Sequence, residues 1–280
     1  MQELRGKVAV VTGSASGMGR AMARRFASEG MKVVLADVEA ETLREAAEEI
    51  GHAGGSAVAV TTDVSSPDSV DELARRAVEE FGAVHLVCNN AGVGGSGELA
   101  WEVPYSVWEW LIRVNLLGVV HGVRSFLPLL IDQSEGHMVN TSSMSGIVPG
   151  VGSTPYTAVK YAVVGLTEAL KLELDMIGSP VKLSVLIPGP VETRIGDSLR
   201  NWPSQLGPPP ERRKKDRVGV LPVPAVLQES LAAKMPPDEV ADLVLDGVRN
   251  DDFWIVTHPK ETAHLLGERT DTLLRSGGSV

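Results

Sequence analysis

Short runs of β-branched and other apolar residues alternate with longer stretches of helical periodicity along most of the chain. This alternation restricts the fold more than any other feature, because strands separated by helices lie parallel in one sheet with helices on its faces. The sequence therefore predicts an α/β protein with a doubly wound parallel sheet. Strands are expected at 8–12, 32–36, 56–61, 85–89, 137–141, 181–187 and 253–257. Helices are expected at 17–29, 39–50, 68–81, 105–131, 155–177 and 237–248.

The length of 280 residues suits one large domain, and a hydrophobic fraction of 43% is enough for a sizeable core. The stretch 196–235 has little periodicity, and we interpret it as a substrate-binding loop or lid within that single domain. Its basic run, 211–217, is best interpreted as a solvated loop, with an anion-binding or nuclear-import segment as the alternatives. Trp202 and the apolar residues 218–221 are candidates for the inner face of the lid. The tail from Gly277 is expected to be frayed.

Charge and cysteine content argue against several other classes of protein. A net charge of −10 and a pI of about 5.1 speak against a general nucleic-acid binder. The single cysteine, Cys88, rules out an internal disulfide, and the scattered histidines lack ligand spacing, so no metal site is expected. Polar residues and a proline interrupt the apolar stretch 119–131, and residues 1–7 lack the apolar core of a signal peptide. We therefore expect a cytoplasmic protein with no membrane span.

A glycine-rich turn joins the first predicted strand to the first predicted helix. Gly13, Gly17 and Gly19 permit a tight turn and allow a pyrophosphate to approach the positive helix N-terminus. Ser16 and Met18 lie between these glycines, at the helix start. Such a turn alone is weak evidence, and a purely structural turn is the alternative. This turn, however, has the preceding strand and the following helix that dinucleotide binding requires.

Asp37 follows the second predicted strand. A carboxylate at this position accepts hydrogen bonds from both ribose hydroxyls of an adenosine and repels a 2′-phosphate. No lysine or arginine follows until Arg44, so the sequence favours NAD over NADP. The alternative is that Asp37 only caps the helix that begins near Glu39.

Tyr156 and Lys160 are four residues apart, which places both side chains on one face of a helix. A phenol has a reference pKa of about 10, and a cation at ~4 Å supplies roughly 4 kcal/mol at an effective dielectric of ~20. Lys160 is therefore expected to lower the pKa of Tyr156 into the working range of a general acid/base. Without further motifs the pair is typical of an ordinary helix surface.

Together these motifs resemble the short-chain dehydrogenase/reductase family, in its single-domain branch. The resemblance covers about 6–194 and resumes from 236, and it implies a Rossmann-type fold. Several separated segments match motifs of the family and follow one another in the same order along the chain. They are Asn89-Asn90-Ala91-Gly92, Asn115, Ser143 thirteen residues before Tyr156, Pro188-Gly189, and Thr193.

The resemblance also implies a role for each catalytic residue. Tyr156 would be the general acid/base, and Lys160 would lower its pKa and bind the nicotinamide ribose. Ser143 would orient the substrate oxygen, and Asn115 would hold a water that links Lys160 to solvent. Ser142 is the alternative to Ser143, and only the spacing to Tyr156 favours Ser143. Asn115 also fits the description of a polar residue in a helix kink.

The remaining matched residues would bind the cofactor. Asp63 could equally be an ordinary loop residue. The implied set is Asp63 and Val64 beside the adenine, Asn89, Ala91 and Gly92 on the cofactor floor, and Pro188, Gly189, Val191 and Thr193 around the carboxamide.

The sequence thus leads to an NAD-dependent oxidoreductase that interconverts a secondary alcohol and a ketone. An NADPH-preferring carbonyl reductase and a non-catalytic nucleotide-sensing protein on the same fold are the alternatives. In the family, helices corresponding to 105–131 and 155–177 pack against a neighbouring subunit, so the resemblance implies a homo-oligomer, with a tetramer expected and a dimer as the alternative. The partner is otherwise a small-molecule substrate.

Overall fold

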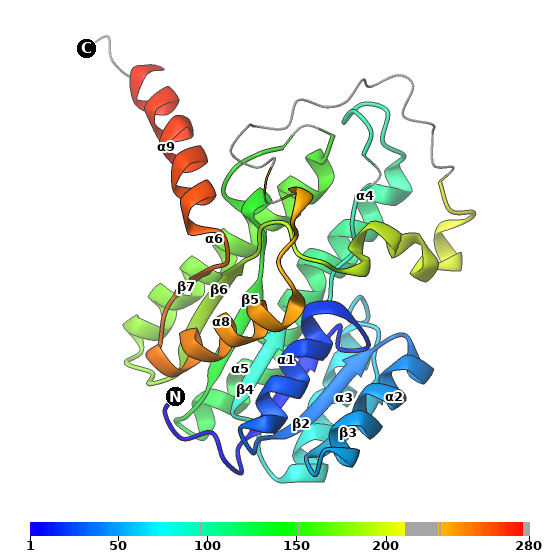
Figure 1. Ribbon diagram of the computed structural model, residues 1–280, viewed down its shortest axis with the longest axis vertical. Coiled ribbons are helices and arrows are strands. Elements are labelled where there is room, and N and C mark those ends of the chain that lie inside the picture. The colour runs from blue at the N-terminus through cyan, green and yellow to red at the C-terminus, as the bar shows by residue number, and fades with distance from the viewer. Residues whose placement is uncertain (96, 151, 211–228, 230, 277–280) are drawn as a thin grey trace.

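The computed structural model describes residues 1–95, 97–150, 152–210, 229 and 231–276. The described strands form one parallel sheet in the order β3-β2-β1-β4-β5-β6-β7, with helices on both faces (Figure 1). The predicted single-domain, doubly wound α/β fold is therefore confirmed. The strands are β1 Val8–Thr12, β2 Lys32–Asp37, β3 Ser56–Thr61, β4 Leu86–Asn89, β5 His137–Thr141, β6 Lys182–Ile187 and β7 Trp254–Val256.

The helices divide into two layers. One face of the sheet carries α1 Gly17–Ser28, α2 Ala40–His52 and α8 Pro237–Asn250. The other face carries α3 Pro67–Phe81, α5 Gly118–Asp132 and α6 Thr154–Met176. Shorter or peripheral elements are α4 Tyr105–Leu111, the π-helical turn η1 Ile112–Leu117, the 3₁₀ turns η2 Met144–Gly146, η3 Arg194–Asn201 and η4 Ser204–Leu206, and α9 Pro259–Ser276.

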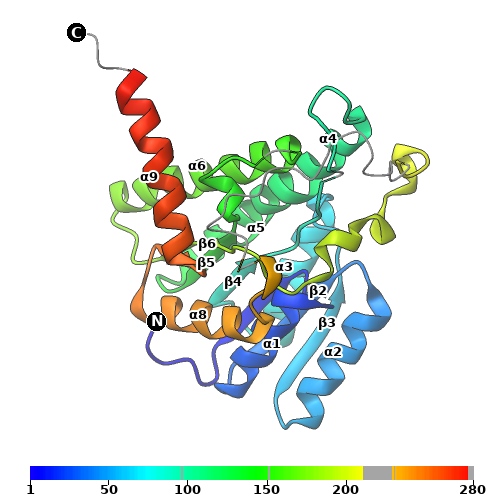
Figure 2. The ribbon, with the colours of Figure 1, turned by 45° about the horizontal axis from the view of Figure 1, so that its top comes forward.

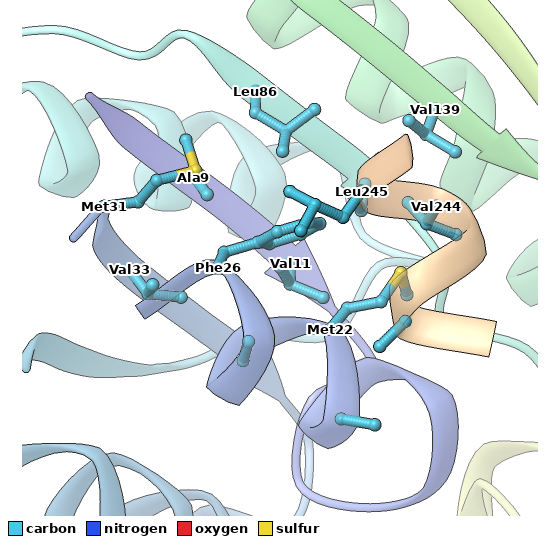
Figure 3. Close-up of a cluster of buried hydrophobic side chains, with 14 of the residues drawn as sticks. Ala9, Val11, Met22, Phe26, Met31, Val33, Leu86, Val139, Val244 and Leu245 are labelled. Atoms are coloured by element: carbon cyan, nitrogen blue, oxygen red, sulfur yellow. The ribbon is translucent and has the colours of Figure 1, made fainter. Parts of the chain in front are cut away.

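Phe26 of α1 is at the centre of the core on the first face. It lies between Leu245 of α8 and the strands, beside Met22, and over Val11 of β1 and Leu86 of β4 (Figure 3). All of these side chains are fully buried. Burying one such side chain contributes roughly 1.5–3 kcal/mol, so this contact fixes α1 and α8 against the middle of the sheet.

The chain reverses its winding direction between β1 and β4. β1 pairs with β2 on one side and with β4 on the other. The loop that follows β1 leads toward one edge of the sheet, and the loop that follows β4 leads toward the other edge. The two loops diverge, which opens a crevice at the carboxyl ends of these strands. The glycine-rich turn follows β1 directly, so it lies at this crevice.

The long helix expected at 105–131 is three consecutive segments. α4 passes through the π-helical turn η1 into α5 without a break. A π turn holds an extra residue relative to an α turn, and such turns often occur at functional sites. Here the turn contains Asn115, which agrees with the alternative that this residue lies at an irregularity of the helix.

Tyr105–Asp132 is long and apolar enough to cross a membrane by length and composition, since one 18-residue stretch of it has a mean hydropathy of 1.6. The sequence analysis expected no apolar stretch long enough to span a membrane, and this expectation was wrong. In the fold, however, α5 packs against β4, β5 and α3, and its buried residues include Phe126 and Leu130. These contacts are those of a core helix beneath a sheet, which explains its apolar composition.

The C-terminal helix α9 was not predicted. It rises away from the sheet, and only its first turns contact the body, through side chains such as Leu265 (Figure 1, Figure 2). Leu273 and Leu274 near its end are 60% and 71% exposed. A helix with so few buried positions lacks a strong core-facing stripe, which is why periodicity did not reveal it. Three segments named in the sequence analysis lie outside the described residues: the basic run 211–217, the apolar residues 218–221 and the tail from Gly277.

Candidate active site

A cavity of about 920 Å³ opens at the carboxyl ends of the strands, where the winding reverses. This volume is at the upper end of the ~300–1,000 Å³ usual for small-molecule sites. Most of the site residues expected from the sequence line it. The exceptions are Asn89 and Asn115, which lie behind its wall.

The glycine-rich turn forms one end of the cavity. Gly13 and Gly17 have φ values of +69° and +54°, a region that favours glycine. A Cβ on Gly19 would lie only 2.1 Å from the Gly13 carbonyl oxygen, so the turn closes only with glycine at that position. Ser16 is the N-cap of α1 but makes no side-chain capping hydrogen bond. The first N–H groups of α1 are thus available to an anion.

Asp37 lines the same end of the cavity, at the end of β2. Its carboxylate accepts hydrogen bonds from the backbone N–H of Ala15, at 3.0 Å, and of Glu39, at 3.1 Å. The N-cap of α2 is Glu39, so Asp37 is not simply the cap of that helix. The two backbone bonds fix the carboxylate beside the glycine turn.

Asp63 and Val64 line the cavity after β3. The Asp63 carboxylate accepts hydrogen bonds from the N–H and hydroxyl of Ser65, at 2.9 and 2.7 Å. The Val64 carbonyl oxygen is 2.8 Å from Nδ1 of His121 on α5. These bonds hold the loop in place next to Asp37.

Asn89 does not form the floor of the cavity, which corrects the expectation from the sequence. Its side chain is buried and donates a hydrogen bond of 2.8 Å to Asn140. It also packs so closely on α5 that a Cβ on Gly122 would be 2.0 Å from Asn89 Oδ1. Asn89 therefore joins β4, β5 and α5, which is a structural role.

The neighbouring residue, Asn90, lies on the cavity wall instead. Its backbone N–H and its side-chain amide donate hydrogen bonds to the Thr12 hydroxyl and carbonyl, both at 2.9 Å. Its Oδ1 is buried and has no hydrogen-bond partner. The sequence motif contains both asparagines, but the alternation of side chains at the strand end decides which of them faces the cavity.

Asn115 is fully buried in the π-helical turn. Its Oδ1 accepts from the Val93 N–H at 2.8 Å, and its Nδ2 donates to the Val93 carbonyl at 2.9 Å. This pair of bonds fixes the backbone immediately after Gly92, which lines the cavity. The water-holding role implied for Asn115 stays a prediction.

Ser143 and Tyr156 lie together at the other end of the cavity. Ser143 follows β5, and its hydroxyl hydrogen-bonds with the Tyr156 phenol on α6. Ser142 is buried, and its hydroxyl donates instead to the Lys160 carbonyl oxygen at 2.8 Å. The structure thus directs Ser143, and not Ser142, to the phenol.

Lys160 lies one turn after Tyr156 on α6, with its ammonium 5.6 Å from the centroid of the phenol ring. The buried ammonium also donates to the Thr141 carbonyl at 2.8 Å. Burial lowers the pKa of Lys160 to about 8. Burial raises the pKa of Tyr156, and the Ser143 hydrogen bond only partly opposes this. The sequence argument counted charge and left out this desolvation, so the expected lowering of the Tyr156 pKa stays a prediction for the complex with the oxidised cofactor.

The burial of Lys160 predicts a pH-dependent stability. The unfolded chain keeps the lysine proton up to ~10.4, whereas the folded protein loses it near pH 8. The unfolded state therefore binds more protons between these values, and folding stability rises with pH. We expect the free energy of unfolding of the unmodified protein, relative to Lys160→Met, to increase by about 2 kcal/mol from pH 8 to pH 10.

Urea titrations followed by circular dichroism at several pH values measure this difference. Burial also raises the pKa of Cys88 and of Tyr156, so the folded protein holds these two protons to higher pH than the unfolded chain does. The free energy of unfolding therefore falls at high pH through these two groups. Both groups are present in the two proteins, so their effects cancel in the difference. Parallel stability profiles from pH 7 to pH 10 would show that Lys160 is not desolvated in the folded protein.

A segment that we call the roof, 194–206, covers the cavity. It begins after Thr193 and contains η3 and η4. At the Asp37 end, the Glu39 carboxylate accepts from Arg200 Nε and Asn201 Nδ2, both at 2.8 Å. Burial raises the pKa of Glu39, but these two hydrogen bonds and the nearby arginine charges together lower it by more, so the pKa lies below its ordinary value. The roof is therefore tied to the loop that follows β2.

At the Tyr156 end the roof is fixed by two further contacts. Ser198 Oγ accepts from the Gly94 N–H at 2.9 Å and donates to the Ile195 carbonyl at 2.6 Å. Trp202 packs edge-on against Trp110 of α4, with ring centroids 5.0 Å apart. The sequence suggested Trp202 for a lid but missed Trp110, Ser198 and the Glu39 contact, because they involve residues far apart in the chain.

Among the residues that the structure describes, no group of three or more His, Cys, Asp and Glu side chains is arranged to hold a metal ion. One cavity is lined by the N-terminus of α1, the Asp37 carboxylate and the side chains of Ser143, Tyr156 and Lys160.

Comparisons with known proteins agree with this geometry. A sequence model of the family described as short chain dehydrogenase matches residues 7–204. The chain is 36% identical over 270 residues to 1-deoxy-11-beta-hydroxypentalenate dehydrogenase of Streptomyces avermitilis, covering 96% of this chain and 90% of that one. It is 36% identical over 205 residues to 3beta-hydroxysteroid dehydrogenase 2 of Eggerthella lenta, covering 73% and 78%.

Among solved structures, a short chain dehydrogenase/reductase from Burkholderia phymatum in complex with NAD has a TM-score of 0.88 and 40% identity, covering 98% of this chain and 97% of that one. A metagenomic short-chain oxidoreductase in complex with NADP has a TM-score of 0.71 and 29% identity, covering 91% and 98%.

Proposed function

The chain belongs to the short-chain dehydrogenase/reductase family, and from this premise we propose that it is an NAD-dependent enzyme that interconverts a secondary alcohol and its ketone, with Tyr156 as the general acid/base. The observation that carries the proposal is the cluster of Ser143, Tyr156 and Lys160 in the same cavity as the open N-terminus of α1. Relatives named as dehydrogenases of a hydroxypentalenate and of a hydroxysteroid support alcohol and ketone chemistry.

The residues of the cavity fit a nicotinamide dinucleotide. The first turn of α1 would hold the pyrophosphate, and Asp37 the adenosine ribose. Asn90 Oδ1 and Thr141 Oγ1 are buried without a partner on the cavity wall, as expected where a polar ligand completes the hydrogen bonding. Hydride would pass from the carbinol carbon to the nicotinamide ring, which is the chemistry that the cofactor supplies.

The side chains of this chain would handle the proton. The Ser143 hydroxyl would orient the substrate oxygen beside the phenol, and Tyr156 would take the alcohol proton as hydride leaves. Burial favours the neutral phenol, so its ionised form needs nearby positive charge. Lys160, 5.6 Å from the ring, supplies such a charge while it is protonated, and the oxidised nicotinamide would supply another that does not depend on pH. Alcohol oxidation should accordingly become faster as the pH rises.

Preference for NAD over NADP would come from Asp37. Its carboxylate is fixed by two backbone hydrogen bonds at the ribose end, where a 2′-phosphate would be repelled. Arg194 and Arg200 also line the cavity, but both form ion pairs with Glu39, which reduces their attraction for a phosphate. The solved relatives include both an NAD and an NADP complex.

Asp37→Ala should reduce the cofactor preference. We expect kcat/KM of the unmodified protein to favour NAD⁺ over NADP⁺ by about 100-fold, or ~3 kcal/mol. Asp37→Ala removes the ribose acceptor and the repelling charge, so the ratio should fall toward one. Glu41→Ala, which removes an exposed carboxylate from the first turn of α2, is the matched control and should keep the ratio. Equal use of both cofactors by the unmodified protein would contradict the proposal.

Two other functions are separated by simple measurements. An NADPH-preferring reductase would show a larger thermal shift with NADP⁺ than with NAD⁺. A non-catalytic nucleotide sensor would show a thermal shift but no absorbance change at 340 nm with any alcohol. The complete set of Ser143, Tyr156 and Lys160 in one cavity speaks against the sensor.

We also propose a cytoplasmic homotetramer with no nucleic-acid partner. Several apolar residues expected at a subunit interface are buried within the protomer, among them Leu111 and Val163. Others remain exposed on the same helices, such as Ile112, Leu117 and Met176. We expect light scattering to give the mass of four chains at micromolar concentration. A mass of one chain would contradict the assembly.

A further inference from the structure

The end of the cavity beyond Tyr156 is apolar. We call its side the tryptophan wall, which consists of Val93, Trp110, Trp202 and Leu206, all lining the cavity. These side chains belong to one hydrophobic cluster, and Tyr156 packs against the same cluster. The reactive phenol therefore lies at the edge of an apolar wall, and a substrate whose oxygen meets the phenol has its adjacent carbon body next to this wall.

Among the described residues, three polar side chains near the tryptophan wall already have partners, whereas Ser204 and Gln205 line the cavity beside Leu206. Ser198 is bonded to Gly94 and Ile195, and Trp202 Nε1 donates to the Gly207 carbonyl at 2.9 Å. Arg113 lines the cavity but forms an ion pair with Glu109 at 2.6 Å. A hydroxyl or a charge placed directly against Val93, Trp110, Trp202 and Leu206 would lose its hydration without a replacement hydrogen bond from these four side chains.

The wall is also preformed. Trp110 comes from α4 and Trp202 from the roof, and their rings meet at 68° in an edge-to-face contact. Aromatic pairs of this kind are favourable in themselves, so the two planes are held before a substrate arrives. A rigid ring body loses fewer rotatable bonds on binding such a wall than a flexible chain does.

We propose that the tryptophan wall binds the apolar ring body of the substrate, which is a carbocyclic secondary alcohol of at least two fused rings or its ketone. Its one polar group, the carbinol oxygen, lies between Ser143 and Tyr156, and the rings lie against Trp202. The inference rests on the proposed alcohol dehydrogenase activity and adds the substrate class to it. Trp202 is the residue that sets this specificity.

The first test compares alcohols of different size and polarity with NAD⁺ and the full chain. We expect kcat/KM for 1-tetralol to exceed that for 2-propanol by at least about 100-fold, since each additional buried methylene contributes roughly fourfold. Sorbitol should not be oxidised measurably. Comparable values for 1-tetralol and 2-propanol would overturn the substrate class and leave the dehydrogenase activity intact. No absorbance change with any alcohol or ketone would overturn the proposed function itself, and with it this inference.

Trp202 variants test the contact. Trp202→Ala should lower the kcat/KM ratio of 1-tetralol to 2-propanol about tenfold or more, mainly through a higher KM for 1-tetralol, with the Kd for NAD⁺ unchanged. Trp202→Phe keeps an apolar ring but loses the bond to Gly207, so it should retain most of the ratio. Trp101→Ala, at a residue that is 82% exposed and outside the cavity, is the matched control.

If Trp202→Phe loses the ratio as completely as Trp202→Ala, the side chain acts by holding the turn at Gly207, and the proposed contact is wrong. An unchanged ratio in Trp202→Ala would show that the Trp202 side chain does not contact the substrate, and it would also overturn the proposal. Circular dichroism and the Kd for NAD⁺ show whether each variant is folded.

Discussion

Replacing Tyr156 with phenylalanine should lower kcat for alcohol oxidation by about three orders of magnitude or more, while the Kd for NAD⁺ changes little. The substitution keeps the ring that packs against the tryptophan wall but removes the proton acceptor. Because Tyr156 lies at the substrate end and the glycine turn at the other end of the cavity, dinucleotide affinity should survive. Stopped-flow absorbance and fluorescence titration measure the two quantities separately.

The matched control is Tyr161→Phe. Tyr161 is on the same helix, but its hydroxyl donates to the Ile147 carbonyl at 2.6 Å and it does not line the cavity. This variant should keep nearly normal turnover. Near-normal turnover by Tyr156→Phe itself would show that the Tyr156 hydroxyl is not the proton acceptor.

The pH profile gives an independent test of the same group. Burial raises the pKa of Tyr156, whereas Lys160 and the oxidised nicotinamide favour the phenolate in the complex. We expect the rate of alcohol oxidation to rise with pH through a single group that titrates below the ~10 of a free tyrosine. The rise should be absent from the residual activity of Tyr156→Phe. A profile that titrates only above pH 10 would show that positive charge does not overcome burial.

Ser143→Ala should lower kcat/KM by about two to three orders of magnitude, which is typical of losing one preorganised hydrogen-bond donor. Its hydroxyl is directed at the phenol, where it would bind the reacting oxygen. The adjacent Ser142→Ala is the sharpest available control, because it removes the same atoms from the neighbouring residue. Ser142 donates to the Lys160 carbonyl, so its loss should cost ~1 kcal/mol of stability and much less activity.

Steady-state kinetics and urea unfolding of both serine variants separate these effects. A larger loss of activity in Ser142→Ala than in Ser143→Ala would reverse the assignment of the two hydroxyls.

The sequence by itself determined those features that depend on local spacing. The alternation of strands and helices led to the parallel sheet, because the period of apolar residues follows directly from the backbone geometry of each element. The glycine turn was predictable for the same reason, since Gly13 and Gly17 adopt positive φ within a few residues of the strand end. The spacing of Tyr156 and Lys160 likewise placed both side chains on one helix face.

Only the tertiary structure decided what depends on packing between distant segments. Asn90 rather than Asn89 faces the cavity, since Asn89 is held by Asn140 of another strand. The tryptophan wall joins Trp110 and Trp202, which no local pattern connects. Burial raises the pKa of Tyr156 in the protein without cofactor, because desolvation depends on everything that surrounds the phenol. Spacing along the chain fixes which side chains share a face, but burial and contacts between elements arise only when the whole chain has folded.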